Sequence, residues 1–148
     1  MNPAGSRGKS KTLATWIALL GGSLGLHRFY LYGWRDLPGW CFPLPTLLGA
    51  YGVYRARVFG LDDLLSWVLI PMLGLMLAGT MLRAIVIGLT QDDAWNARFN
   101  ADSVADRSGW LNVVGVVLAL ALGAAALMAT LAFSAQRFFE IQMESETG

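Results

Sequence analysis

The distribution of apolar and polar positions divides this chain of 148 residues into long uncharged segments separated by short polar ones. A helix that crosses a bilayer needs about 20 mainly apolar residues, because each residue adds about 1.5 Å and the hydrocarbon layer is roughly 30 Å thick. Four segments approach that length: 12–26, 37–54, 64–82 with a continuation to Leu89, and 110–133. The pattern predicts an all-α integral membrane protein with four transmembrane helices in two hairpins.

The second segment is the least regular of the four. Pro38, Pro43 and Pro45 remove backbone hydrogen-bond donors from its first half, so we expect a regular helix to start near Pro45. In contrast, residues 64–82 and 110–133 carry no charge, as is typical of helices that cross lipid.

These segments divide the chain into four parts, which are residues 1–11, 12–57, 58–135 and 136–148. The first part is basic and is expected to be disordered. The second and third are the two helix pairs, and the last is an acidic tail that is expected to fray from the fourth helix. Within the third part a polar loop covers 91–109, where the four-residue spacing of Trp95 and Phe99 favours a short interfacial helix.

The amino-acid composition also indicates a membrane protein. It is 55% hydrophobic and 14% charged, whereas a soluble domain has about 25% charged residues. The net charge of +1 gives no reason to expect a nucleic-acid partner. Cys41 is the only cysteine, which excludes an intrachain disulfide and indicates a packing role for this thiol.

Basic residues ahead of the first apolar segment also fit a signal peptide. Arg7, Lys9 and Lys11 precede that segment, but no small-residue cleavage site follows it. We therefore interpret it as an uncleaved span.

The distribution of basic residues predicts the orientation of the four spans. Six fall on the side of the termini: Arg7, Lys9, Lys11, Arg55, Arg57 and Arg137. The opposite side has four, or five if the side chain of Arg83 extends that way: Arg28, Arg35, Arg98 and Arg107. Because cytoplasmic loops carry an excess of Lys and Arg, both termini are expected in the cytoplasm. Four tryptophans lie on the opposite side, as in an interfacial belt: Trp34, Trp40, Trp95 and Trp110.

Small residues at a spacing of four are candidates for close helix packing. Gly21 and Gly25 form one such pair in the first segment. The fourth segment has two stripes: Gly115, Ala119 and Gly123, and Ala121, Ala125 and Ala129. We expect one of these stripes to face the other helices. Glycine is also common in membrane helices in general, so a seam at Gly21 and Gly25 remains one of two interpretations.

Catalytic and metal-binding patterns are weak. Residues 21–25 fit the G-x-S-x-G string of serine hydrolases, but that motif requires a base from elsewhere in the fold, and the only histidine, His27, is four residues beyond Ser23. One histidine and one cysteine match no metal-ligand spacing. The sequence thus predicts no catalytic residue, no metal site and no cofactor.

The most distinctive polar cluster is His27, Arg28, Phe29 and Tyr30, followed by Gly33. It is expected to form an interfacial turn between the first two spans. In one interpretation this turn holds the helices together or receives a partner or an anionic lipid. In the other, Arg28 extends to the headgroups and the aromatic rings anchor the interface.

Residues 9–54 resemble the TM-2 domain family, in which two membrane helices are joined by a turn with an (H/D)RFYLG-like motif. The matching residues are Lys-Ser-Lys at 9–11, Gly-Ser-Leu-Gly at 22–25, His-Arg-Phe-Tyr-Leu at 27–31, and Gly33. The chain departs from this pattern where Tyr32 precedes Gly33 and where prolines begin the second span. His27 stands where many eukaryotic members have aspartate, so the receptor-like coupling role suggested for that aspartate is not carried over.

The resemblance implies an integral membrane protein without established enzymatic activity. Two further spans resemble a helix pair appended in some bacterial members, which implies a bacterial inner membrane. The family also implies that the turn faces the cytosol, whereas the distribution of basic residues with four spans favours the outside, which is the orientation we expect.

We therefore expect a non-enzymatic scaffold or assembly partner that acts through helix–helix or lipid contacts. Its expected partners are the lipid bilayer and either a second copy of the chain or another membrane protein. The alternative is a small transporter or channel component that uses Arg83, because a charge within a membrane span is costly.

Overall fold

The computed structural model describes residues 8–60 and 62–147, and these residues fold into helices without a strand. The elements are α1 (Lys11–Gly21), η1 (Gly22–Leu24), α2 (Leu26–Tyr32), α3 (Leu37–Cys41), α4 (Pro43–Phe59), α5 (Leu64–Leu89), α6 (Asp92–Phe99) and α7 (Trp110–Thr147). The predicted all-α class is confirmed for this part of the chain.

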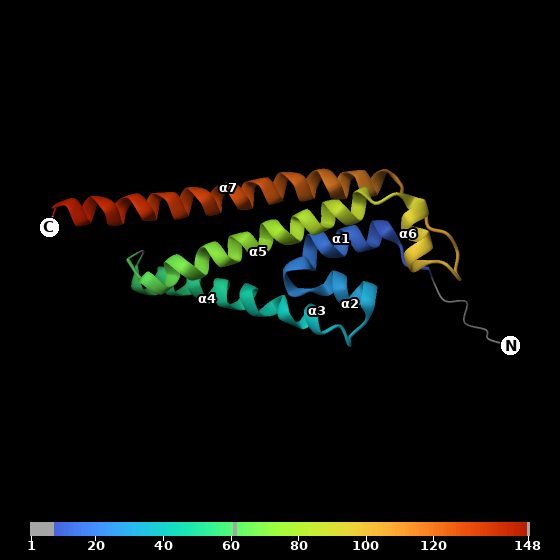
Figure 1. Ribbon diagram of the computed structural model, residues 1–148, viewed down its shortest axis with the longest axis horizontal. Helices are drawn as coiled ribbons and strands as arrows, with labels where there is room; N and C mark the ends of the chain where they lie inside the picture. Colours follow the sequence, from blue (N-terminus) through green and yellow to red (C-terminus); the bar gives the residue numbers. More distant parts are fainter. Residues whose placement is uncertain (1–7, 61, 148) are drawn as a thin grey trace.

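The bundle is built around α5, which runs along the long axis of the molecule (Figure 1). α4 packs along one side of α5 and α7 along another, and α1 contacts both α5 and α7. We call the end with α6 the capped end, and the end with the α4–α5 turn the open end. The start of α1 lies at the capped end and the last turns of α7 extend beyond the open end, on opposite sides of the molecule (Figure 1).

Two helices, α5 and α7, are long and apolar enough to cross a bilayer. At 26 and 38 residues they extend about 39 and 57 Å. Only 28% of the most apolar window of α5 and 11% of that of α7 is buried, so their apolar side chains mostly face outward. This distribution differs from that of a core helix in a soluble protein, and it supports association with a membrane.

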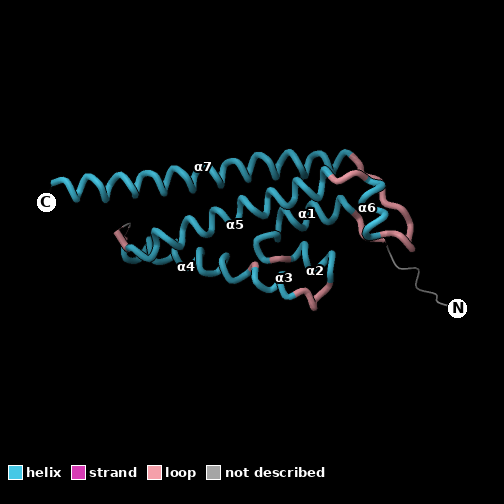
Figure 2. Tube along the Cα trace, viewed as in Figure 1, coloured by secondary structure: helices cyan, strands magenta, loops and turns pink. Residues whose placement is uncertain are grey.

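The first expected span, 12–26, is not one helix. α1 ends at Gly21 after about 16 Å, η1 follows, and α2 then returns toward the capped end (Figure 2). The chain reverses at Gly25, which has a φ of 76° in the left-handed region. A Cβ atom at Gly25 would lie 2.3 Å from the carbonyl oxygen of Gly39, so both the φ angle and the close approach require glycine.

Helical structure in the second segment begins earlier than expected. Pro38 and Pro43 occupy first-turn positions of α3 and α4, where proline removes no intrahelical hydrogen bond. Phe42 between the two helices also has helical dihedral angles. Residues 37–59 therefore form a nearly continuous helical path, about 34 Å long if fully helical.

The ends of the chain differ from the sequence prediction. Of the segment 1–11 that was expected to be disordered, residues 1–7 lie outside the described part, but 8–11 are placed and Lys11 begins α1. The acidic tail from Gln136 continues α7 as a regular helix to Thr147. The short helix expected around Trp95 and Phe99 is confirmed as α6.

Candidate functional site

The predicted aromatic turn is a helix with a polar clasp at its end. His27, Arg28, Phe29 and Tyr30 all lie in α2, and the turn itself follows Gly33. Arg28 does not extend freely to the surface, because its Nε and Nη2 atoms donate to the two carboxylate oxygens of Asp36 at 2.5 and 3.1 Å. These hydrogen bonds hold the pKa of Asp36 below its ordinary value. Asp36 also accepts from the backbone N–H of Gly39 and so caps α3.

Aromatic rings close the turn between α2 and α3. Phe29 stacks on Trp34 with ring centroids 5.2 Å apart, and lies 5.2 Å from the ring of Trp40. Gly33 has a φ of 85°, which allows the chain to leave α2. On the other side, the Tyr30 hydroxyl accepts from the backbone N–H of Ser10 at 3.0 Å. The motif thus fixes both the α2–α3 turn and the entry into α1.

His27 is completely buried. Its ring meets Phe42 edge-on, with centroids 5.4 Å apart. Neither ring nitrogen has a hydrogen-bond partner among residues 8–60 and 62–147, so Ser23 and His27 are not joined by the hydrogen bond that a nucleophile and its base require. The positive charges of Arg28 and Arg83 lie near enough to the imidazole ring to disfavour its protonated form.

Gly21 and Gly25 do not form a helical packing seam, because α1 ends between them. A Cβ atom at Gly21 would lie 2.4 Å from Cδ1 of Leu26, and one at Gly22 would lie 2.9 Å from Cβ of Thr80. These glycines let the returning chain and α5 approach the end of α1.

One predicted small-residue stripe of α7 faces the other helices. Gly115 lies against Thr15 of α1, Ala119 is fully buried, and Gly123 lies against Met81 of α5. The second stripe, Ala121, Ala125 and Ala129, is exposed.

A buried hydrogen-bond relay reinforces the packed face of α7. The Thr15 hydroxyl donates to Oδ1 of Asn112 at 3.0 Å, and Nδ2 of Asn112 donates to the carbonyl of Gly88 at 2.7 Å. The relay joins α1, α5 and α7. Sequence analysis missed it, although a single asparagine in an apolar segment is a signal for such a contact.

At the capped end, two lysines are held by α6 and the loop that follows it. Lys11 is 3% exposed, and its Nζ donates to Oδ1 of Asp92 at 2.5 Å and to the carbonyl of Thr90 at 2.6 Å. Asp92 also accepts from Ser108, and these donors lower its pKa to about 2. Nζ of Lys9 donates to the carbonyl of Leu31, and the backbone of Lys9 accepts from Nε1 of Trp95 at 2.8 Å.

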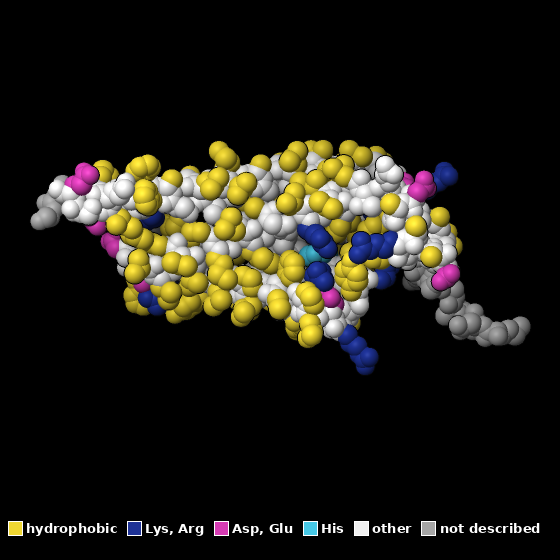
Figure 3. Space-filling model, viewed as in Figure 1, with side chains coloured by type: hydrophobic (Ala, Val, Ile, Leu, Met, Phe, Trp, Pro, Cys, Tyr) yellow, Lys and Arg dark blue, Asp and Glu magenta, His cyan; other side chains and the backbone are white. Residues whose placement is uncertain are grey.

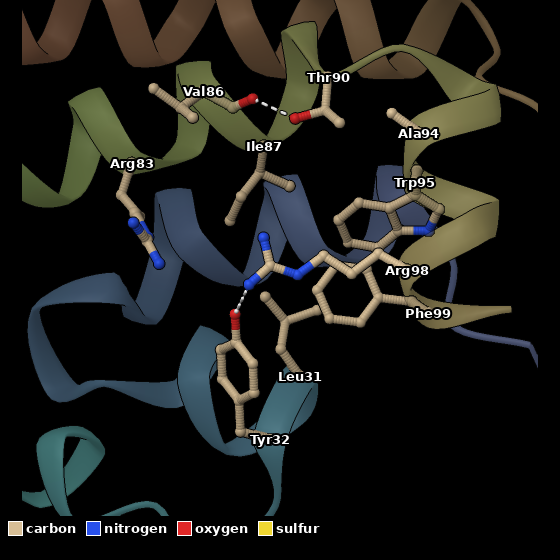
Figure 4. A pocket seen from close by; sticks show the side chains of 10 residues that line it. All are labelled: Leu31, Tyr32, Arg83, Val86, Ile87, Thr90, Ala94, Trp95, Arg98 and Phe99. Atoms are coloured by element: carbon tan, nitrogen blue, oxygen red, sulfur yellow. Dashed lines mark hydrogen bonds between the residues drawn. The ribbon is translucent and has the colours of Figure 1, made fainter.

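A pocket of about 110 Å³ opens between α2, α5 and α6, and two arginines point into it (Figure 4). Arg83 comes from α5 and Arg98 from α6, and Nη2 of Arg98 donates to the Tyr32 hydroxyl at 3.1 Å. Trp95 and Phe99 form an aromatic wall, with ring centroids 4.5 Å apart. None of the described residues that line the pocket is acidic.

The same region is visible on the surface. Lys and Arg side chains gather beside the single histidine on the face shown in Figure 3, and yellow apolar side chains extend along the bundle away from them. The sequence pattern marks Arg83 as an unusual charge and puts Arg98 in the polar segment 91–109, but does not link the two. Arg83 and Arg98 come together because the chain returns through α6 across the end of the bundle. The pattern of apolar residues does not predict this return.

Comparison of the chain with protein-family models, with curated proteins and with solved structures finds no match in any of the three.

Proposed function

We propose that this protein is a non-enzymatic, multi-pass membrane protein that acts as an assembly partner through its transmembrane helices. The observation that carries the proposal is the outward face of α7, whose most apolar window is only 11% buried. A helix of this composition with so little contact to its own chain is expected to meet lipid or another helix.

The proposed topology has three crossings, by α3–α4, α5 and α7, and a hairpin of α1, η1 and α2 that enters to about half depth. Irregular backbone at membrane depth is tolerated where protein surrounds it, and Gly22 and Gly25 both lie against neighbouring segments. This arrangement replaces the four crossings expected from the sequence, because α1 and α2 are each too short to cross.

Basic residues favour one orientation of this topology. Among the described basic residues other than Arg83, which lies within α5, six are at the capped end: Lys9, Lys11, Arg28, Arg35, Arg98 and Arg107. Three lie at the open end: Arg55, Arg57 and Arg137. This excess supports the orientation that we propose, with the N-terminus in the cytoplasm and the C-terminus on the other side of the membrane. The α2–α3 turn then faces the cytosol, as the family resemblance implies. A bacterial inner membrane is the proposed location on that resemblance.

For the partner, we propose α7 of a second copy. Ala121 and Ala125 are four residues apart on the exposed side of α7, opposite the face that packs on α5. Small residues allow two helix backbones to approach closely in lipid. The same stripe on two copies is self-complementary about a two-fold axis normal to the membrane, which is the commonest symmetry of homo-oligomers.

The test is disulfide crosslinking in native membranes, in a Cys41→Ser background. Ala125→Cys is expected to give a crosslinked dimer on mild oxidation. Leu120→Cys is the matched control, because Leu120 is also exposed to lipid but lies on a different side of the helix. No dimer from Ala125→Cys, or equal amounts from both positions, contradicts the proposed interface.

The transport hypothesis rests on Arg83 alone. Because Arg83 lines a side pocket near the capped end, we do not propose that it lies on a path through the bundle.

A further inference from the structure

We propose that the pocket between α2, α5 and α6 binds the phosphate group of an anionic phospholipid, held between the guanidinium groups of Arg83 and Arg98. This proposal rests on the membrane location, but it does not depend on association through α7.

The first argument is the balance of charge. Arg83 has no hydrogen bond or ion pair with a described residue, and the side chain of Arg98 donates only to the neutral hydroxyl of Tyr32. Of the carboxylates at this end, Asp36 pairs with Arg28 and Asp92 with Lys11, and no acidic residue is among the described residues that line the pocket. Two arginines therefore share a pocket at the membrane boundary that has no acidic residue among its described lining. Such a pair of charges is stabilised by an anion from outside the chain.

The second argument is depth. Arg83 is six residues before the end of α5, so its Cα lies about 9 Å inside that end. A long arginine side chain at this depth reaches toward the headgroup layer. Arg98 belongs to α6, which lies across the end of the bundle (Figure 1). The two guanidinium groups therefore approach the pocket from the lipid side and from the aqueous side of the boundary, where lipid phosphates lie.

The third argument separates a lipid from a free phosphate ion. The α5 surface beside the pocket is apolar and open to lipid, because Leu82, Val86 and Leu89 are 62%, 54% and 69% exposed. These side chains offer a continuous surface for acyl chains whose headgroup occupies the pocket. A free ion would leave that surface unused.

The chemistry of the donors fits phosphate. Guanidinium groups bind phosphate oxygens through paired, charge-assisted hydrogen bonds. The Tyr32 hydroxyl already orients Arg98, and Trp95 and Phe99 add an apolar wall to the pocket. Basic pockets between membrane helices on the cytoplasmic side are known to select anionic headgroups, which agrees with the proposed orientation.

The experiment uses the full-length protein purified in a mild nonionic detergent. Phosphatidylglycerol, phosphatidylcholine and inorganic phosphate are titrated separately, and binding is followed by native mass spectrometry and by the shift of the unfolding temperature. We expect saturable binding of phosphatidylglycerol and a rise in the unfolding temperature, with little effect of the other two. Equal effects of phosphatidylcholine overturn the choice of an anionic lipid, and equal effects of inorganic phosphate overturn the choice of a lipid.

Variants assign the binding to the pocket. Arg83→Gln is expected to weaken phosphatidylglycerol binding about tenfold or more, the loss expected for a charge-assisted hydrogen bond. Arg83→Lys keeps the charge without the planar fork and is expected to be intermediate. Arg107→Gln removes the same charge from the exposed loop and is expected to bind like the wild type. If Arg83→Gln and Arg107→Gln bind equally, the pocket is not the site.

Two controls keep the outcomes distinct. Unfolding of Arg83→Gln without added lipid shows whether the fold is retained, and Arg98→Gln gives a second variant if it is not. Ala125→Leu, which disrupts the proposed α7 contact, is expected to leave lipid binding unchanged. Loss of the dimer with lipid binding intact therefore contradicts only one of the two proposals.

Discussion

The two ends of the bundle are held together in different ways. At the capped end, hydrogen bonds join segments far apart in the sequence: Lys11 with Asp92 and Thr15 with Asn112. At the open end, the closest ion pairs are local, as between Arg55 and Asp63, eight residues apart. The longer contact there, from Arg137 to Asp62, measures 3.9 Å and involves a fully exposed carboxylate.

This difference indicates that the capped end stabilises the tertiary structure, whereas α7 extends beyond the open end. The capped end needs α1, α5, α6 and α7 in place at once, so its polar contacts stabilise the tertiary arrangement. At the open end the shortest ion pairs are local, the long-range contact from Arg137 to Asp62 is longer and exposed, and α7 continues past this end as a helix. We therefore expect a substitution at the capped end to lower the free energy of unfolding more than the matched substitution at the open end.

The largest effect is expected from Gly25→Ala in the hairpin of the capped half. The left-handed φ costs about 1–2 kcal/mol for a residue with a Cβ, and the clash with the Gly39 carbonyl adds to that cost. We expect a total loss of about 3 kcal/mol or more. Gly60→Ala at the open end has the same sign of φ, but no described residue outside its chain neighbours lies within 4 Å of its Cβ, so about 1 kcal/mol is expected. Unfolding in detergent compares the two, and equal losses contradict the prediction.

The second effect concerns the ion pairs at the two ends. Asp92→Asn leaves Lys11 buried without its counter-charge, and we expect a loss of about 2 kcal/mol. Asp63→Asn at the open end is expected to cost less, because its partner Arg55 is more exposed than Lys11. Denaturation of the two variants in the same detergent measures the difference. If Asp63→Asn loses more free energy of unfolding than Asp92→Asn, the capped end is not the more strongly stabilised one.

The third effect is a dependence on pH. The pKa of Asp92 falls from 3.8 to about 2 in the folded protein, so between these values the unfolded state binds the proton more readily. Its contribution is complete above about pH 4 and is lost as the pH falls toward 2. The stability difference between wild type and Asp92→Asn should therefore shrink over this range. A difference that stays constant from pH 5 to about 2 contradicts the assignment.

The smallest effect is expected at His27. The buried ring makes no hydrogen bond with a described residue, so His27→Leu removes none and should change the free energy of unfolding by less than about 1 kcal/mol. Thermal unfolding of this variant provides the measurement. A loss above about 2 kcal/mol would show that the imidazole has an essential partner.

The long helices could be predicted from the sequence because their signal is local. Uncharged runs indicated α5 and α7, and the spacing of Trp95 and Phe99 indicated α6. Hydropathy reports how apolar a segment is, but not whether the chain continues or turns back. Segment 12–26 was therefore interpreted as a span, although its glycine-rich end contained the signal for a reversal.

The polar features of the site were harder to predict, because they depend on tertiary contacts. The sequence pattern puts Lys11 in a basic segment that is expected to be disordered, and only the return of the chain through α6 places Asp92 beside it. Arg83 was noticed for its position in an apolar segment, but its pocket also requires Arg98 and Tyr32 from two other elements. No pattern within one segment brings these three residues together.

The topology is tested most directly by the accessibility of single cysteines in sealed, oriented membrane vesicles. Ser6→Cys, Asp102→Cys and Ser145→Cys are placed separately in a Cys41→Ser background and treated with a maleimide that does not cross the membrane. Three crossings and a half-depth hairpin predict that Ser6→Cys and Asp102→Cys react from one side and Ser145→Cys from the other. Reaction of Ser6→Cys and Ser145→Cys from the same side, with Asp102→Cys opposite, would contradict this topology and restore four crossings.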